Sequence, residues 1–183
     1  MLLSREKAAI PQSPAGGSLA SVDRNEPSEK PTVESFFAQR DYHGALTLID
    51  FESRVSGGES SCDALKWKAL AHVRLMSYQE AMKIYEVLVE KPDCDPSVYC
   101  YLAGCYFYLG MYRKAEEAVQ RAPHSSLQNR VQFHLAQKQG DEARLMTHHR
   151  ALEYDVVEDQ LALAAMHYLR AHYQEAADIY KNL

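Results

Sequence analysis

Apolar residues recur at helical spacing from about Thr32 to the end of the chain. The stretch "VYCYLAGCYFYLGMY", residues 98–112, carries no charge at all. One of its faces follows the spacing i, i+3, i+4 and i+7 through Tyr99, Leu102, Ala103 and Tyr106. Two glycines interrupt the stretch and Arg113 follows it at once, whereas a membrane helix needs about 20 apolar residues. The pattern therefore predicts a helix of a protein core and not a membrane span.

The same pattern returns along the chain at a fixed interval. The segment "YQEAMKIY" begins at Tyr78, "YRKAEEAV" at Tyr112 and "YQEAADIY" at Tyr173. Tyr112 follows Tyr78 by 34 residues, and a helix-turn-helix unit of this length is typical of tetratricopeptide repeats. Such units bury their apolar faces by stacking on one another. The sequence therefore predicts an all-α tetratricopeptide repeat solenoid.

Alanine recurs where the two helices of a unit are expected to cross. In the first helices the small residues are Ala69, Ala103 and Ala164, and in the second helices they are Ala45, Ala81, Ala115 and Ala176. Larger side chains there would force the helices apart. The turn between them requires a chain reversal, for which Gly110 is suited, and Met76 holds the same position one period earlier.

These positions define about five helix-turn-helix units, at residues 32–57, 58–92, 93–126, 127–155 and 156–183. We expect an abbreviated first helix in the first unit, and a shortened fourth unit that turns at Gly140. Residues 1–31 combine proline, serine, glycine and mixed charges without apolar periodicity, which predicts a disordered tail. No polar capping helix closes residues 32–183, so we expect this array to be the first part of a longer one.

Charge and motifs give no indication of catalysis. The net charge is −5 and the basic residues are not clustered, so neither nucleic acid binding nor membrane insertion is expected. The four cysteines form no CxxC pair, which favours reduced thiols in the cytosol. Phosphate-loop, nucleophile-elbow and zinc-protease motifs do not occur, and adjacent helical residues such as His148 and His149 point apart. We expect no enzyme activity, cofactor or metal.

Solenoids bind partners on the concave surface that their first helices line. Beside the packing stripe, the third and fifth units carry a second stripe of mostly apolar and aromatic residues. Our candidates for partner binding are Cys100, Gly104, Phe107, Tyr108, Tyr168 and Leu169. Either a partner segment or further repeats of the same chain could cover them. A clamp for a peptide carboxylate would need several cations, and only Lys66 and Arg74 come close.

Three segments resemble one known family more closely than a generic repeat does: "YFYLGMYRKAEEA", "APHSSLQNRVQFHLAQK" and "EDQLALAAMHYLRAHYQEAADIYK". From about Phe37 to Leu183 the chain resembles the N-terminal part of the tetratricopeptide subunit family of intraflagellar transport complex B. The resemblance implies a non-enzymatic adaptor that binds other complex B subunits, above all the forty-six kilodalton-class subunit, and supports transport of motility-related cargo. It also implies a location in the cilium or flagellum, at the ciliary base and in the cytoplasm. The alternative is a cytosolic co-chaperone-like adaptor that binds peptides.

Overall fold

The computed structural model describes residues 31–57 and 61–183, and its regular structure in these residues is entirely α-helical. The first five helices are α1 (Val33–Ala38), α2 (Tyr42–Val55), α3 (Cys62–Arg74), α4 (Tyr78–Val89) and α5 (Val98–Tyr108). The other five are α6 (Tyr112–Arg121), α7 (Ser126–Gln139), α8 (Glu142–Arg150), α9 (Val157–Leu169) and α10 (Tyr173–Asn182). The predicted disordered tail lies, except for Pro31, outside the described residues.

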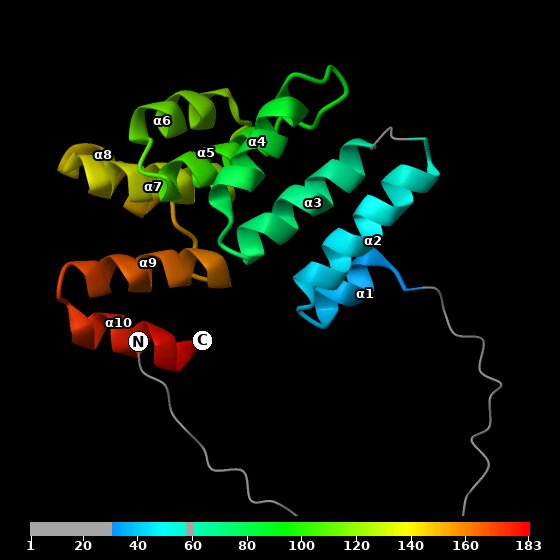
Figure 1. Ribbon diagram of the computed structural model, residues 1–183. Helices are drawn as coiled ribbons and strands as arrows, with labels where there is room; N and C mark the ends of the chain where they lie inside the picture. Colours follow the sequence, from blue (N-terminus) through cyan, green and yellow to red (C-terminus); the bar gives the residue numbers. More distant parts are fainter. Residues whose placement is uncertain (1–30, 58–60) are drawn as a thin grey trace, which may run out of the picture. The chain divides into compact units, whose positions relative to one another are not determined.

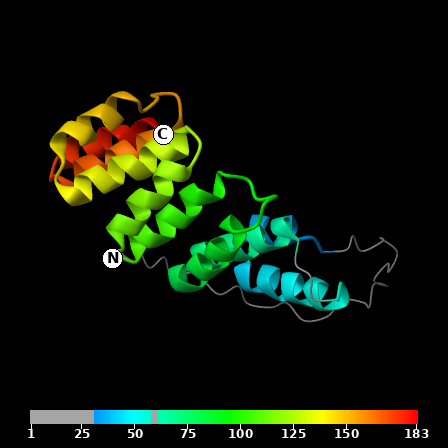
Figure 2. The ribbon, with the colours of Figure 1, turned by 90° about the horizontal axis from the view of Figure 1, so that it is seen from above.

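The helices pack as five consecutive pairs, α1–α2, α3–α4, α5–α6, α7–α8 and α9–α10, which follow one another in chain order (Figures 1 and 2). The predicted all-α repeat fold is confirmed. The first helix of the first pair, α1, has only six residues, as its abbreviated pattern indicated. Between pairs, α2 packs on α3, α4 on α5 and α6 on α7, but α9 packs mainly on α7 instead of on α8.

Each alanine that the spacing assigned to a helix crossing is buried: Ala45, Ala69, Ala81, Ala103, Ala115, Ala164 and Ala176. The fourth pair differs at both equivalent positions. Phe133 lies seven positions before the turn residue Gly140, as Ala103 lies seven before Gly110. Leu145 lies five positions after Gly140, as Ala115 lies five after Gly110. Phe133 and Leu145 are both buried, so two large apolar side chains fill this crossing in place of two alanines.

All five turns place one residue in the left-handed conformation, two positions before the second helix begins. These residues and their φ angles are Arg40 (58°), Met76 (58°), Gly110 (75°), Gly140 (71°) and Ala171 (62°). The next residue donates its N–H to the carbonyl five positions back, as Met111 does to Tyr106 at 2.8 Å. This is the Schellman arrangement that ends many helices, and it favours glycine because a Cβ atom is strained there.

The variant Met76→Gly should therefore stabilise the protein. Relief of a left-handed strain of about 1 to 2 kcal/mol exceeds the entropy that glycine adds to the unfolded chain, so we expect a net gain of about 0.5 to 1 kcal/mol. The Met76 side chain is mostly exposed and little packing is lost. Urea unfolding would measure the gain, and Gly110→Ala should lower stability by a similar amount. Destabilisation by both substitutions would contradict this account of the turns.

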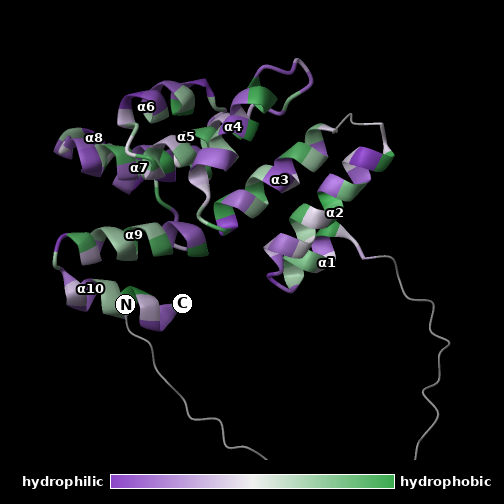
Figure 3. Cartoon of the chain, viewed as in Figure 1, coloured by the Kyte–Doolittle hydropathy of each residue, from purple (hydrophilic) through white to green (hydrophobic). Residues whose placement is uncertain are grey.

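The uncharged stretch that includes α5 forms part of the protein core. Six of the eleven side chains of α5 are buried: Val98, Cys100, Leu102, Ala103, Cys105 and Tyr106. Tyr99, expected in the packing stripe, is only half-buried, and Val98 and Cys105 pack in the core as well. Hydrophilic and hydrophobic residues alternate along the helices (Figure 3). Within the described residues no helix has both the length and the apolar character that crossing a membrane requires.

Candidate partner-binding groove

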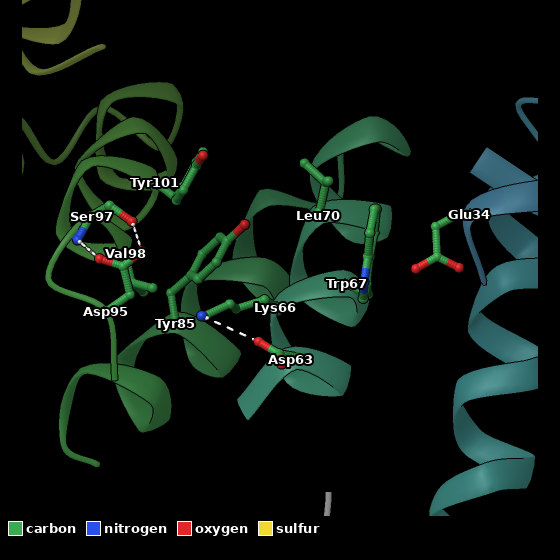
Figure 4. Close-up of a pocket in the computed structure, with 10 residues that line it drawn as sticks. All are labelled: Glu34, Asp63, Lys66, Trp67, Leu70, Tyr85, Asp95, Ser97, Val98 and Tyr101. Atoms are coloured by element: carbon green, nitrogen blue, oxygen red, sulfur yellow. Dashed lines mark hydrogen bonds and ion pairs between the residues drawn. The ribbon is translucent and has the colours of Figure 1, made fainter. Parts of the chain in front are cut away.

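A groove runs across the first helices of successive pairs. We name one part the apolar half; it has a volume of about 450 Å³, and α3, α5, α7 and α9 line it. The acidic half, of about 490 Å³, lies between α1, α3 and α5 (Figure 4). Leu70, Tyr85 and Tyr101 line both halves, so the two adjoin at these residues.

The repeat register explains how the apolar half forms. The position six residues before each turn residue is Leu70 in α3, Gly104 in α5, His134 in α7 and Ala165 in α9. All four residues line the apolar half. Because each pair repeats the same geometry, one register position presents the same side of each first helix to the groove.

Three of the six predicted partner-binding residues line the apolar half: Cys100, Gly104 and Tyr108. Cys100 is only 2% exposed, although the sequence suggested that packing does not require it. A Cβ atom added to Gly104 would meet no other atom within 4 Å, so this glycine opens directly onto free space. Tyr108 is mostly exposed and stacks on Tyr78, with ring centroids 4.4 Å apart.

The other three predicted residues do not line the groove. Phe107 contacts Tyr112 at 5.7 Å between ring centroids, and Tyr168 contacts Tyr173 at 5.5 Å. In both pairs of rings, the first aromatic residue lies three positions before the left-handed turn residue, and its partner lies two positions after that residue. The aromatic rings therefore hold the two helices of one pair together and do not point into the groove. Leu169 is half-exposed at the end of α9, beyond the groove.

Aromatic rings and carboxylates line the acidic half. Its aromatic residues are Trp67, Tyr85 and Tyr101, and its charged residues are Glu34, Asp63, Lys66 and Asp95. Lys66 forms an ion pair of 3.4 Å with Asp63. Hydrogen bonds from the hydroxyl and the backbone N–H of Ser97 lower the pKa of Asp95. The acidic half therefore carries three carboxylates and a single cation that is already paired.

Arg130 lines the apolar half, but its charge is also paired. Its guanidinium donates to Oδ1 of Asp159 at 2.5 Å, and the backbone N–H of Glu153 donates to Oδ2 at 3.0 Å. Asp159 is completely buried at the start of α9. This ion pair joins α7 to α9. The main role of Arg130 is therefore to hold these two lining helices together.

The adjacent pair His148 and His149 takes part in packing. Nδ1 of His148 lies 2.8 Å from Oδ1 of Asn129, and the Asn129 amide donates to the His148 carbonyl at 3.0 Å. The His149 ring lies 6.3 Å from the Phe133 ring. In the described ranges, no three histidine, cysteine or acidic residues are grouped so that they could hold a metal ion, and the four cysteines form no disulfide.

His134 should make stability depend on pH. Burial, together with Arg130 and Lys138, lowers the pKa of His134, and burial likewise lowers the pKa values of His72 and His148. The unfolded chain thus takes up protons near pH 6.5 before the folded chain does, and stability falls as the pH drops below that value. We expect a lower melting temperature at pH 5.5 than at pH 7.

The variant His134→Gln should show a smaller difference between the two melting temperatures, measured by circular dichroism. The exposed His43 of α2 provides a matched control, because His43→Gln should leave the difference unchanged. An equal effect of both substitutions would contradict the role of burial at His134.

Comparisons with known proteins show which family this chain belongs to. The family model described as intraflagellar transport protein 56 matches residues 65–183. A Caenorhabditis elegans protein described as an intraflagellar transport protein 56 homolog is 33% identical over 155 residues. The chain belongs to the intraflagellar transport protein 56 family. The match to the worm relative covers 84% of this chain but 27% of that protein, so the chain spans about a quarter of its length.

Solved structures agree with the repeat fold of this intraflagellar transport protein 56 family member. The crystal structure of a thermophilic TPR protein of Thermus thermophilus matches with a TM-score of 0.68 and 20% identity, over 82% of this chain and 85% of that one. MamA of Desulfovibrio magneticus matches with a TM-score of 0.59 and 13% identity, over 82% and 88%. At these identities the likeness concerns the fold alone.

Proposed function

We propose that this chain is a non-enzymatic scaffold of intraflagellar transport complex B, and that its groove holds a segment of another subunit. Membership of the intraflagellar transport protein 56 family supports the role in transport. The observation that carries the scaffold role is the pair of adjoining hollows across successive first helices, because repeat solenoids bind extended partners along such surfaces. The forty-six kilodalton-class subunit is the proposed partner.

In this proposal the scaffold supports transport of motility-related cargo in the cilium or flagellum, with pools at the ciliary base and in the cytoplasm. Its contribution is to hold a partner in position, since the groove combines apolar surface with the cations Lys66 and Arg130, which are paired within the fold. Such a surface suits a protein segment better than a small substrate that must react.

The co-chaperone alternative finds less support in the geometry. Capturing a peptide carboxylate requires cations that are free to donate hydrogen bonds. Lys66 is paired with Asp63 and Arg130 with Asp159, whereas Arg74 is exposed and does not line the groove. The charges of the groove therefore do not favour a peptide carboxylate.

The variant Gly104→Leu tests the proposal, because a Cβ atom at this position meets no other atom within 4 Å and the leucine side chain would occupy space in the apolar half. Leucine is also a better helix former than glycine, so helicity and stability should be retained. We expect at least a tenfold loss of affinity for the purified forty-six kilodalton-class subunit, which is about 1.4 kcal/mol. The matched control Gln120→Leu lies on the exposed face of α6 and should bind normally. Unchanged binding by Gly104→Leu would refute the groove as the partner site.

A further inference from the structure

We infer that the acidic half of the groove receives a lysine or arginine side chain of the partner segment, while apolar residues of the same segment enter the apolar half. The inference rests on the proposed function and names the chemistry of the partner. Three features of the acidic half carry the inference: its carboxylates, its aromatic walls, and the hydroxyl of the buried Tyr85 side chain, which opens onto the pocket.

The charges of the acidic half favour a cation. Three carboxylates, those of Glu34, Asp63 and Asp95, line it together with the one ammonium group of Lys66. Glu34 faces Trp67 across the pocket (Figure 4), and in the part of the chain that the structure describes its carboxylate has no hydrogen bond or ion pair. A positive side chain placed there would offset the excess negative charge, whereas a partner carboxylate would add to it.

Tyr85 gives an independent indication of a ligand. Its side chain is 2% exposed, and its hydroxyl extends into the space between Tyr101, Leu70 and Trp67 (Figure 4). No group among residues 31–57 and 61–183 forms a hydrogen bond with this hydroxyl. Burial also raises the pKa of Tyr85, so the group stays neutral and can both donate and accept. In the described residues no fully buried polar side-chain atom lacks a partner, so the hydroxyl of this buried side chain opens onto the pocket, where a ligand atom can bind it.

The aromatic walls suit the same kind of side chain. Trp67 packs on Phe37 with ring centroids 4.8 Å apart, and Tyr85 stacks on Tyr101 at 5.9 Å. These contacts hold the rings in place before a ligand arrives. Aromatic faces attract ammonium and guanidinium groups, and they also accommodate the aliphatic stems of lysine and arginine.

The segment that enters must also carry apolar residues beside its basic residue. Leu70, Tyr85 and Tyr101 line both halves, so the two halves are neighbours. Beyond them the groove is mostly apolar, with Gly104, Ala165 and Leu161 among its lining residues. A chain that passes from one half to the other therefore meets carboxylates first and aliphatic surface next.

Trp67 is the only tryptophan of the chain and lines the acidic half, so its fluorescence reports on this site. The probes are three capped peptides, acetyl-Ser-Leu-Leu-Xaa-Leu-Leu-Ser-amide, in which Xaa is arginine, glutamine or glutamate. Titrations with the full chain should show at least tenfold tighter binding of the arginine peptide than of the glutamine peptide, and weaker binding still of the glutamate peptide. Equal affinities, or no response of Trp67 to the arginine peptide, would overturn the inference.

Two conservative variants assign the effect to named groups. Glu34→Gln removes one charge, and Tyr85→Phe removes only the hydroxyl. Each variant should bind the arginine peptide with about three- to tenfold lower affinity, as expected for the loss of one hydrogen bond or ion pair. The exposed Glu52 of α2 provides the control, because Glu52→Gln should leave the affinity unchanged. If Glu52→Gln weakens binding as much as Glu34→Gln does, a general effect of net charge explains the result and the inference fails.

The two proposals can fail separately. If the three peptides bind equally but Gly104→Leu still abolishes capture of the complex B subunit, the scaffold role stands and the preference for a basic residue is wrong. If the arginine peptide binds selectively but Gly104→Leu captures the subunit normally, the acidic half binds cations and the proposed partner lies elsewhere.

Discussion

Replacing Asp159 with alanine should lower the free energy of unfolding by about 3 to 5 kcal/mol, because the substitution leaves a largely buried cation without its partner. Asp159 is completely buried, and the Arg130 side chain that it pairs with is 18% exposed. The backbone N–H of Glu153 would lose its acceptor as well. Urea unfolding followed by circular dichroism would measure the loss.

Two comparisons make the Asp159 experiment specific. Glu80 pairs with Lys83 on the exposed surface of α4, and Glu80→Ala should have little effect, since exposed ion pairs contribute little. The double variant Arg130→Met with Asp159→Leu should recover much of the stability, because it removes both buried charges together. Equal destabilisation by Glu80→Ala and Asp159→Ala would contradict the importance of burial.

Phe133→Ala should be similarly damaging, with an expected loss of about 3 to 5 kcal/mol. The result is informative because the second, third and fifth pairs carry alanine at this position of their first helices. Phe133 is 1% exposed and packs with Leu145, Leu163 and Met166. The helices of the fourth pair pack around the large ring of Phe133, so alanine at this position would leave a cavity.

Phe51 offers the same substitution in an exposed setting on α2. Phe51→Ala should change stability by less than about 0.5 kcal/mol, as most surface substitutions do. Thermal or urea unfolding of both variants would separate loss of core packing from loss of an aromatic residue as such. A stable Phe133→Ala protein would mean that α7 and α8 can close together as the other pairs do.

Periodicity predicted the features that depend on positions close together in the chain. The five pairs, the crossing alanines and the turns at Gly110 and Gly140 follow from residues within one 34-residue unit. The ring contacts of Phe107 and Tyr168 could have been predicted too. Each lies five residues before its partner, at a register position that Phe37 and Tyr42 share.

The rest of the groove depends on contacts between units. Tyr85 ends the repeated segment "YQEAMKIY" of a second helix, α4, but the repeat does not indicate that its side chain reaches the groove between α3 and α5. Arg130 and Asp159 are 29 residues apart, so only the fold shows that they meet. Counting back from every turn residue would have found Leu70 and His134, since they share the register of Gly104.

The junction at which α9 packs mainly on α7 has a consequence for how the protein opens. In repeat arrays each unit is stabilised by its nearest neighbours, and here the last pair packs on the preceding pair mainly through α7, with side-chain contacts to Leu145 and Glu142 of α8. The amide protons of α9 and α10 should therefore exchange with solvent as one group, at a lower opening free energy than those of α3 to α6. Leu161 and Ala165 of α9 line the groove. Opening of α9 and α10 would therefore remove one wall of the groove and allow a bound segment to dissociate through that side.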